Sequence, residues 1–181
     1  APPEPAMPAA GAEDVVRELA LSEGATFRPA TALFRDFAIR CRQQGIASAQ
    51  IDLARFRRMF ACQIGGFGRL EGAVRSQVEA MIAGVDDDVL APYLAMLVAE
   101  VLGEPMPDEE ELARLYGSSS PSRIRRLLDH LERSGLIVVR EEFGAPWVKL
   151  KVAKIGVMKD VRRVGVHIQR SRAGIVVPPT A

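Results

Sequence analysis

The side chains with the most distinctive chemistry lie between residues 120 and 126, in the run SPSRIRR. Two hydroxyl and three guanidinium groups occur in this short segment: Ser120, Ser122, Arg123, Arg125 and Arg126. Hydroxyl and guanidinium groups donate hydrogen bonds to phosphate oxygens, and arginine also pairs with the acceptor edge of guanine. The segment is therefore suited to a polyanion, provided that one element presents these groups on the same side.

The other polar patterns do not predict catalysis or metal binding. Asp86, Asp87 and Asp88 stand where a helix is expected to begin, so we interpret them as a cap that complements the helix dipole. The run GGFG at 65–68 lacks the Lys-Ser/Thr of a phosphate-binding loop. The two histidines lie in no recognisable proton relay. We expect no enzymatic activity, no cofactor and no metal ion.

The run 121–133 has the spacing of an amphipathic helix. Four aliphatic side chains fall at i, i+3, i+4 and i+7 and so share one face: Ile124, Leu127, Leu128 and Leu131. Ser120 is a preferred N-cap residue, and Pro121 suits the first helical position. A shorter helix, opened by Pro107 and ended by Gly117, precedes it. The pattern predicts two successive helices, of which the second is buried on one side and basic on the other.

Two strands are expected directly after this helix. Gly135 ends the helix, and the β-branched run 136–140 is typical of a strand. After a short turn, apolar residues alternate with Lys149 and Lys151 over 147–152, so that one face is apolar and the other basic. Two strands joined by a tight turn behind such a helix form a wing.

The stretch 120–137, SPSRIRRLLDHLERSGLI, resembles the recognition helix and following strand of bacterial winged-helix regulators of the GntR and MarR type. In that pattern a serine opens the helix, arginines follow a β-branched residue, and the helix closes on Leu-x-x-x-Gly-Leu-Ile. The winged helix-turn-helix pattern to which this stretch belongs, residues 108–139, covers about a fifth of the chain. The resemblance implies a winged helix-turn-helix that binds DNA in the major groove. The side chains that it implies for DNA contact are Ser120, Ser122, Arg123, Arg125 and Arg126. One departure is that the turn between the strands begins with Glu141 and Glu142, which would repel phosphate.

Charge is distributed unevenly along the chain. Residues 1–113 hold 10 Lys and Arg against 18 Asp and Glu, a difference of −8. Residues 114–181 hold 14 against 5, a difference of +9. Because the basic half includes the helix at 121–133, this split favours nucleic acid as the partner. The alternative is a solvated basic face, or a basic tail that binds the acidic half of a partner subunit.

The sequence before the motif is predicted to be helical. Apolar spacing and glycine breaks indicate helices over the ranges 13–21, 30–44, 51–61, 70–83 and 86–102. The last helix is apolar on all sides, which favours burial at the centre of the helical half or at a dimer interface. The second and third of these predicted helices could also form a degenerate helix-turn-helix that exposes Arg55, Arg57 and Arg58. Their aromatic residues fit packing in a core better.

The predicted organisation has four parts. Residues 1–12 form a Pro- and Ala-rich disordered leader, and 13–104 form a helical domain for packing or dimerisation. Residues 105–155 form the winged helix-turn-helix, and 156–181 form a basic, strand-forming tail. The predicted fold class is mainly α with a small antiparallel β wing, a winged helix-turn-helix preceded by a helical bundle.

The cysteines and the hydropathy of the chain indicate the cellular compartment that is expected for it. Cys41 and Cys62 both lie in helical patterns, so we expect reduced, buried thiols in a cytoplasm and no disulfide. No apolar run reaches the ~20 residues of a membrane span, so no membrane partner is expected.

Two functions follow from these patterns. The first is a DNA-binding transcriptional regulator, cytoplasmic and nucleoid-associated, that acts as a homodimer on double-stranded DNA. Arg125 and Arg126 would contact phosphates or guanine edges, and Lys149 and Lys151 would contact the backbone beside the wing. The second is a winged-helix interaction module that uses the same basic face to dock an acidic protein partner in a replication, segregation or transcription assembly.

Overall fold

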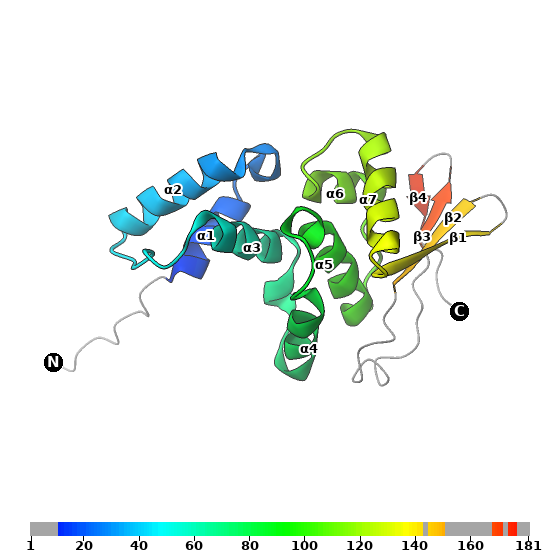
Figure 1. Cartoon of the computed structure of the whole chain (residues 1–181), viewed down its shortest axis with the longest axis horizontal. Coiled ribbons are helices and arrows are strands. Elements are labelled where there is room, and N and C mark those ends of the chain that lie inside the picture. The colour runs from blue at the N-terminus through cyan, green and yellow to red at the C-terminus, as the bar shows by residue number, and fades with distance from the viewer. Residues whose placement is uncertain (1–10, 143–144, 151–167, 172–173, 177–181) are drawn as a thin grey trace.

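The computed structural model describes residues 11–142, 145–150, 168–171 and 174–176. Over these residues, seven α-helices precede four strands (Figure 1). The helices are α1 (Ala12–Ala20), α2 (Ala30–Gln43), α3 (Leu53–Ile64), α4 (Gly72–Ile82), α5 (Asp87–Leu102), α6 (Glu109–Leu115) and α7 (Pro121–Arg133). Two 3₁₀ helices, η1 (Ala25–Phe27) and η2 (Phe67–Arg69), lie between them. The helices predicted from apolar spacing are confirmed, with ends that differ by up to three residues.

The first hydrophobic cluster joins α1, α2 and α3. Its centre is aromatic: the ring centroids of Phe37 and Phe56 lie 5.1 Å apart, and those of Phe34 and Phe56 lie 5.5 Å apart. Cys41 is buried in this cluster, whereas Cys62 on α3 is half-buried, and both thiols are free. The aromatic residues of α2 and α3 therefore pack a core, which was the favoured interpretation of this pair.

The second hydrophobic cluster surrounds α5. All residues from Val89 to Ala99 except Ala95 are buried, and α3, α4, α6 and α7 of the same chain contact the helix. At the end of α3, a Cβ added at Gly65 would lie 3.0 Å from the Leu94 side chain, so this glycine permits the close approach of α3 to α5. Burial also raises the pKa of Tyr93 to about 12. The apolar surface of α5 is thus covered within one chain.

Four strands follow α7: β1 (Ile137–Glu142), β2 (Ala145–Leu150), β3 (Ile168–Ser171) and β4 (Gly174–Val176). They form one antiparallel sheet in the order β1-β2-β3-β4. Ile137 pairs with Leu150, and Val148 pairs with Ile168 on the next strand. In Figure 1 α7 lies between α6 and this sheet, and α7 contacts both α6 and β1.

The predicted fold class, mainly α with a small antiparallel β wing, is wrong. The packed body, residues 11–136, contains helices and no strand, and both hydrophobic clusters are built from its helices and turns together with Ile137 at the start of β1. The segment after α7 is not a two-stranded wing either, because the second edge of β2 pairs with β3. Alternation of apolar and polar residues predicts a strand, but it does not say how many of the strand's two hydrogen-bonding edges will find a partner.

Among the residues that the structure describes, no helix is both long and apolar enough to cross a bilayer.

Candidate nucleic-acid interface

Helices α6 and α7 are joined by a turn, residues 116–120, that is anchored to the first half of the chain. The Asp108 carboxylate caps α6 by accepting a hydrogen bond from the Glu111 amide at 2.8 Å. Gly117 then takes φ +66°, a left-handed conformation that favours glycine. A Cβ at this position would lie 2.8 Å from the Thr26 carbonyl oxygen in η1. The turn therefore packs closely on η1, and this contact orients α7 relative to α1–α3.

The serines of the turn form a local hydrogen-bond network. Ser118 is buried, and its hydroxyl accepts a hydrogen bond from the Ser120 amide at 3.1 Å. Ser120 is the N-cap residue of α7, as predicted, but its hydroxyl does not bond a helix amide. It lies instead 2.9 Å from the Ser122 hydroxyl, with which it shares a hydrogen bond. Two of the predicted site residues are thus brought together at the start of α7.

The aliphatic side of α7 is buried, as its spacing predicts. Ile124, Leu127, Leu128 and Leu131 all belong to the second hydrophobic cluster. This burial fixes the rotation of the helix about its axis, because turning it would expose four large apolar side chains. Ser122, Arg123, Arg125 and Arg126 consequently lie on the exposed side. We call these four residues the arginine face.

The guanidinium groups of the arginine face differ from most others in the described part of the chain. Seven arginines elsewhere form ion pairs with carboxylates: Arg17, Arg28, Arg40, Arg57, Arg58, Arg69 and Arg114. Within the described residues, no carboxylate lies at ion-pair distance from Arg123, Arg125 or Arg126. Their hydrogen-bond donors are available to a ligand without the loss of an internal ion pair.

The positive charge is concentrated in the first half of α7. The second half is mixed: Asp129 and Glu132 are exposed, and Arg133 donates to the Asp129 carbonyl at 3.3 Å. His130 lies 3.8 Å from Asp86 at the start of α5. Because the helix dipole also favours an anion at the N-terminal end, a polyanion would be bound best beside residues 122–126.

Of the two predicted lysines, only Lys149 belongs to the described part of the chain. Lys149 is in β2, opposite Val138 of β1, and Lys151 lies outside the described residues. Glu141 and Glu142 form the end of β1. The contact of α7 with β1 places the start of the sheet against the helix.

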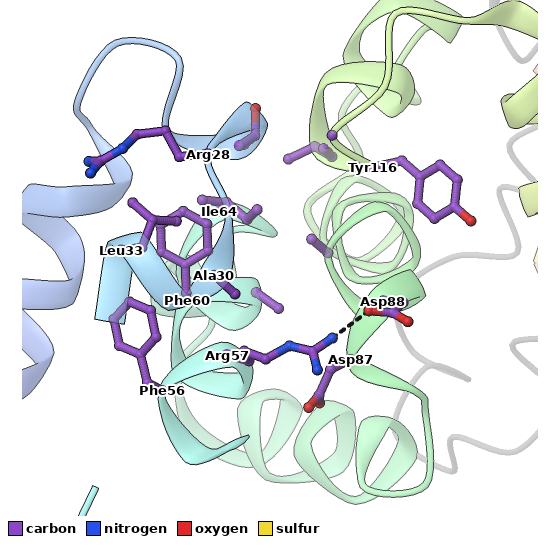
Figure 2. A pocket seen from close by; sticks show the side chains of 15 residues that line it. Arg28, Ala30, Leu33, Phe56, Arg57, Phe60, Ile64, Asp87, Asp88 and Tyr116 are labelled. Carbon is purple, nitrogen blue, oxygen red and sulfur yellow. Dashed lines mark hydrogen bonds and ion pairs between the residues drawn. The ribbon is translucent and has the colours of Figure 1, made fainter. Parts of the chain in front are cut away.

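The arginines of the possible second helix-turn-helix have structural partners. Arg57 pairs with Asp88 across 2.5 Å, from α3 to the first turn of α5 (Figure 2). Arg58 donates to the Val85 carbonyl at 2.8 Å and to the Asp87 carboxylate at 3.1 Å, and it also donates to the carbonyl of the last residue of α4. These two side chains therefore connect α3 to the junction of α4 and α5. Of the three arginines predicted to be exposed on α3, only Arg55 is exposed. This stabilising role was not predicted, because the spacing of residues within one helix does not reveal long-range partners.

Figure 2 shows a small cavity, about 170 Å³, between the α2–α3 pair and the α5–α6 side. Phe56 and Phe60 line it from α3, and Tyr116 lines it from the turn after α6. Its four charged lining residues are each paired within the chain: Arg28, Arg57, Asp87 and Asp88. The cavity therefore offers no unpaired charge to a ligand.

A larger groove, about 720 Å³, lies beside α6 and the start of α7. Its lining includes the four consecutive acidic residues 108–111, together with Phe27, Ser118, Ser119 and Ile124. Phe27 is unusual among the large apolar residues, since 55% of its surface is exposed. The Arg114 side chain bonds Glu111 at 2.7 Å and holds the pKa of that carboxyl below its usual value. We call this feature the acidic groove; the pattern between Pro107 and Gly117 predicted a helix but not this groove.

Comparison of the chain with protein-family models, curated proteins and solved structures finds no match. Within the described residues, no group of three His, Cys, Asp or Glu side chains could hold a metal ion. A function is therefore inferred from the geometry and charge of α6 and α7.

Proposed function

We propose that the chain binds double-stranded DNA through the arginine face of α7. The observation that carries the proposal is the set of three exposed guanidinium groups that have no carboxylate partner among the described residues, on a helix whose opposite side is buried. Elsewhere in the described part of the chain, seven arginines are neutralised by ion pairs. A rigid helix that exposes unpaired arginines matches the requirement for contact with phosphates and base edges.

The dimensions of α7 suit this task. Its 13 residues span about 20 Å at 1.5 Å per residue, and the major groove of DNA, about 12 Å wide, admits an α-helix. Arg125 and Arg126 would donate to phosphate oxygens or to the O6 and N7 atoms of guanine. The hydroxyls of Ser120 and Ser122, which already lie together at the N-terminal end, would bind a phosphate. Site-specific binding of this kind would make the chain a transcription regulator.

Fluorescence anisotropy with a labelled duplex tests the proposal. The variant with Arg125→Ala and Arg126→Ala should bind more weakly than the wild type. If both side chains contact phosphates, the slope of log affinity against log salt should also become smaller by about 2. If one of them reads a guanine, its loss should instead cost about 1–3 kcal/mol at one base position.

A matched control uses two arginines that are also exposed and have no ion pair in the described residues, Arg42 on α2 and Arg55 on α3. The Arg42→Ala, Arg55→Ala variant removes the same charge and should bind duplex DNA like the wild type. Equal affinity of the wild type and the α7 variant would refute the proposal. Affinity of the wild type for duplex DNA that does not change with salt would refute it too, and would favour an acidic protein as the ligand of the arginine face.

A further inference from the structure

The arginine face and the acidic groove lie next to each other. Helices α6 and α7 contact one another, and Ile124 of α7 also lines the groove. The groove carries four carboxylates and one guanidinium group, Arg114, whereas the arginine face carries three guanidinium groups. Glu110 in the groove is exposed and has no partner in the described residues. The surface therefore holds two complementary charged patches that do not neutralise each other within one chain.

Two copies of such a surface match one another across a two-fold axis. In an isologous interface, each contact between patch i of one copy and patch j of the other occurs twice. Here the arginine face of one copy would enter the acidic groove of the second, and the same contact would repeat with the roles exchanged. One symmetric contact would thus pair the unneutralised charge on both copies.

Phe27 supplies an apolar centre for the contact. A guanidinium group stacks favourably over an aromatic ring, and the gain increases when water is excluded. The chain already contains this arrangement, because the Arg75 guanidinium lies 4.4 Å from the centroid of the Phe67 ring. In the acidic groove, the exposed Phe27 ring lies among carboxylates, so an incoming arginine would meet both a ring face and an anionic partner.

We propose that the α6–α7 surface is a self-association site, where the arginine face of one copy of this chain docks into the acidic groove of a second copy. This inference goes beyond DNA binding and does not depend on it, because association is measured without nucleic acid. The same arginines cannot contact DNA and the second copy at once, so the two ligands would compete.

Sedimentation velocity of the full chain tests the inference with charge reversals. The groove variant carries Glu110→Arg, and the face variant carries Arg125→Glu and Arg126→Glu. The wild type should form dimers at about 0.05 M salt and dissociate at about 1 M salt, where the Debye length falls to about 3 Å. Each variant alone should dimerise at least about tenfold more weakly, since like charges then face each other at both contacts.

Sedimentation of an equimolar mixture of the two variants is the decisive measurement. In a mixed dimer the new arginine faces the new glutamates, and the second contact is that of the wild type, so the mixture should dimerise again. Dimerisation of the mixture would also show that both variants are folded. As controls, Glu79→Arg on α4 and Arg42→Glu on α2 reverse exposed charges elsewhere and should leave dimerisation unchanged.

Three results would overturn the inference. The first is a wild-type chain that stays monomeric at low salt. The second is a groove or face variant that associates as strongly as the wild type. The third is a mixture of the two variants that stays monomeric although the wild type dimerises.

Discussion

Gly117→Ala should destabilise the chain more than Gly135→Ala, although both glycines follow a helix and take the same backbone conformation. Their φ angles are +66° and +73°. An L residue with a Cβ in the left-handed conformation destabilises the folded chain by about 1–2 kcal/mol. Alanine also makes the unfolded chain less flexible than glycine does, which offsets about 0.4–1 kcal/mol of this loss. The strain alone should therefore lower the free energy of unfolding by about 1 kcal/mol at either position.

The two positions differ in their surroundings. A Cβ at Gly135 meets nothing within 4 Å, whereas a Cβ at Gly117 would lie 2.8 Å from the Thr26 carbonyl oxygen. The obstacle is backbone, so relief requires η1 or the turn to move, and overpacking of this kind costs typically about 1–3 kcal/mol. We expect a total loss of about 2–4 kcal/mol for Gly117→Ala. Urea unfolding followed by circular dichroism, with equal m-values, would measure the difference.

Equal losses for the two variants would refute this reasoning, because they would mean that the contact between the turn and η1 carries no packing constraint. A Gly117→Ala chain with wild-type stability would also refute the expectation that alanine is strained in the left-handed conformation at this position.

Three further changes test other parts of the fold. Leu127→Ala should lower the free energy of unfolding by about 2–5 kcal/mol, since this side chain of α7 is almost fully buried; urea unfolding would measure the loss. Arg58→Ala should cost about 1–3 kcal/mol, because it removes the donor to the Val85 carbonyl and one of the two donors to the Ile82 carbonyl at the end of α4; faster amide exchange in α4 would report it. The ion pair with Arg114 lowers the pKa of Glu111 in the folded chain. This ion pair therefore stabilises the fold at pH values above the ordinary carboxyl pKa of 4.5, and the stabilisation is lost as the pH falls through the lower pKa of the folded chain. Urea midpoints between about pH 6 and pH 3 should therefore fall less for Arg114→Gln than for the wild type.

The candidate site was largely predictable from the sequence. The spacing of Ile124, Leu127 and Leu131 gave the buried side of α7, and the remaining positions had to be exposed. Ser120, Arg125 and Arg126 were placed correctly because the period of a helix is a local property of its own residues. The binding partner stays a prediction, as does the division into leader, helical domain, motif and tail.

Other features required long-range contacts. Arg57 and Arg58 resembled an exposed basic helix surface in the sequence, yet they pair with carboxylates about 30 residues away. The pattern between Pro107 and Gly117 predicted a short helix, and the role of the carboxylates at 108–111 as one wall of a groove depends on Phe27 of η1. The two-stranded wing was inferred from a β-branched run and an alternating segment, whereas the sheet has four strands.

Local periodicity and glycine positions were enough to define the helices, the two sides of α7 and the uneven distribution of charge. Those properties depend on residues a few positions apart, which meet in any chain that forms a helix. Tertiary structure decided which arginines are neutralised, what covers α5, and which surface lies beside the arginine face. These outcomes depend on contacts between distant segments, which form only when the two hydrophobic clusters assemble and are not encoded in any one segment.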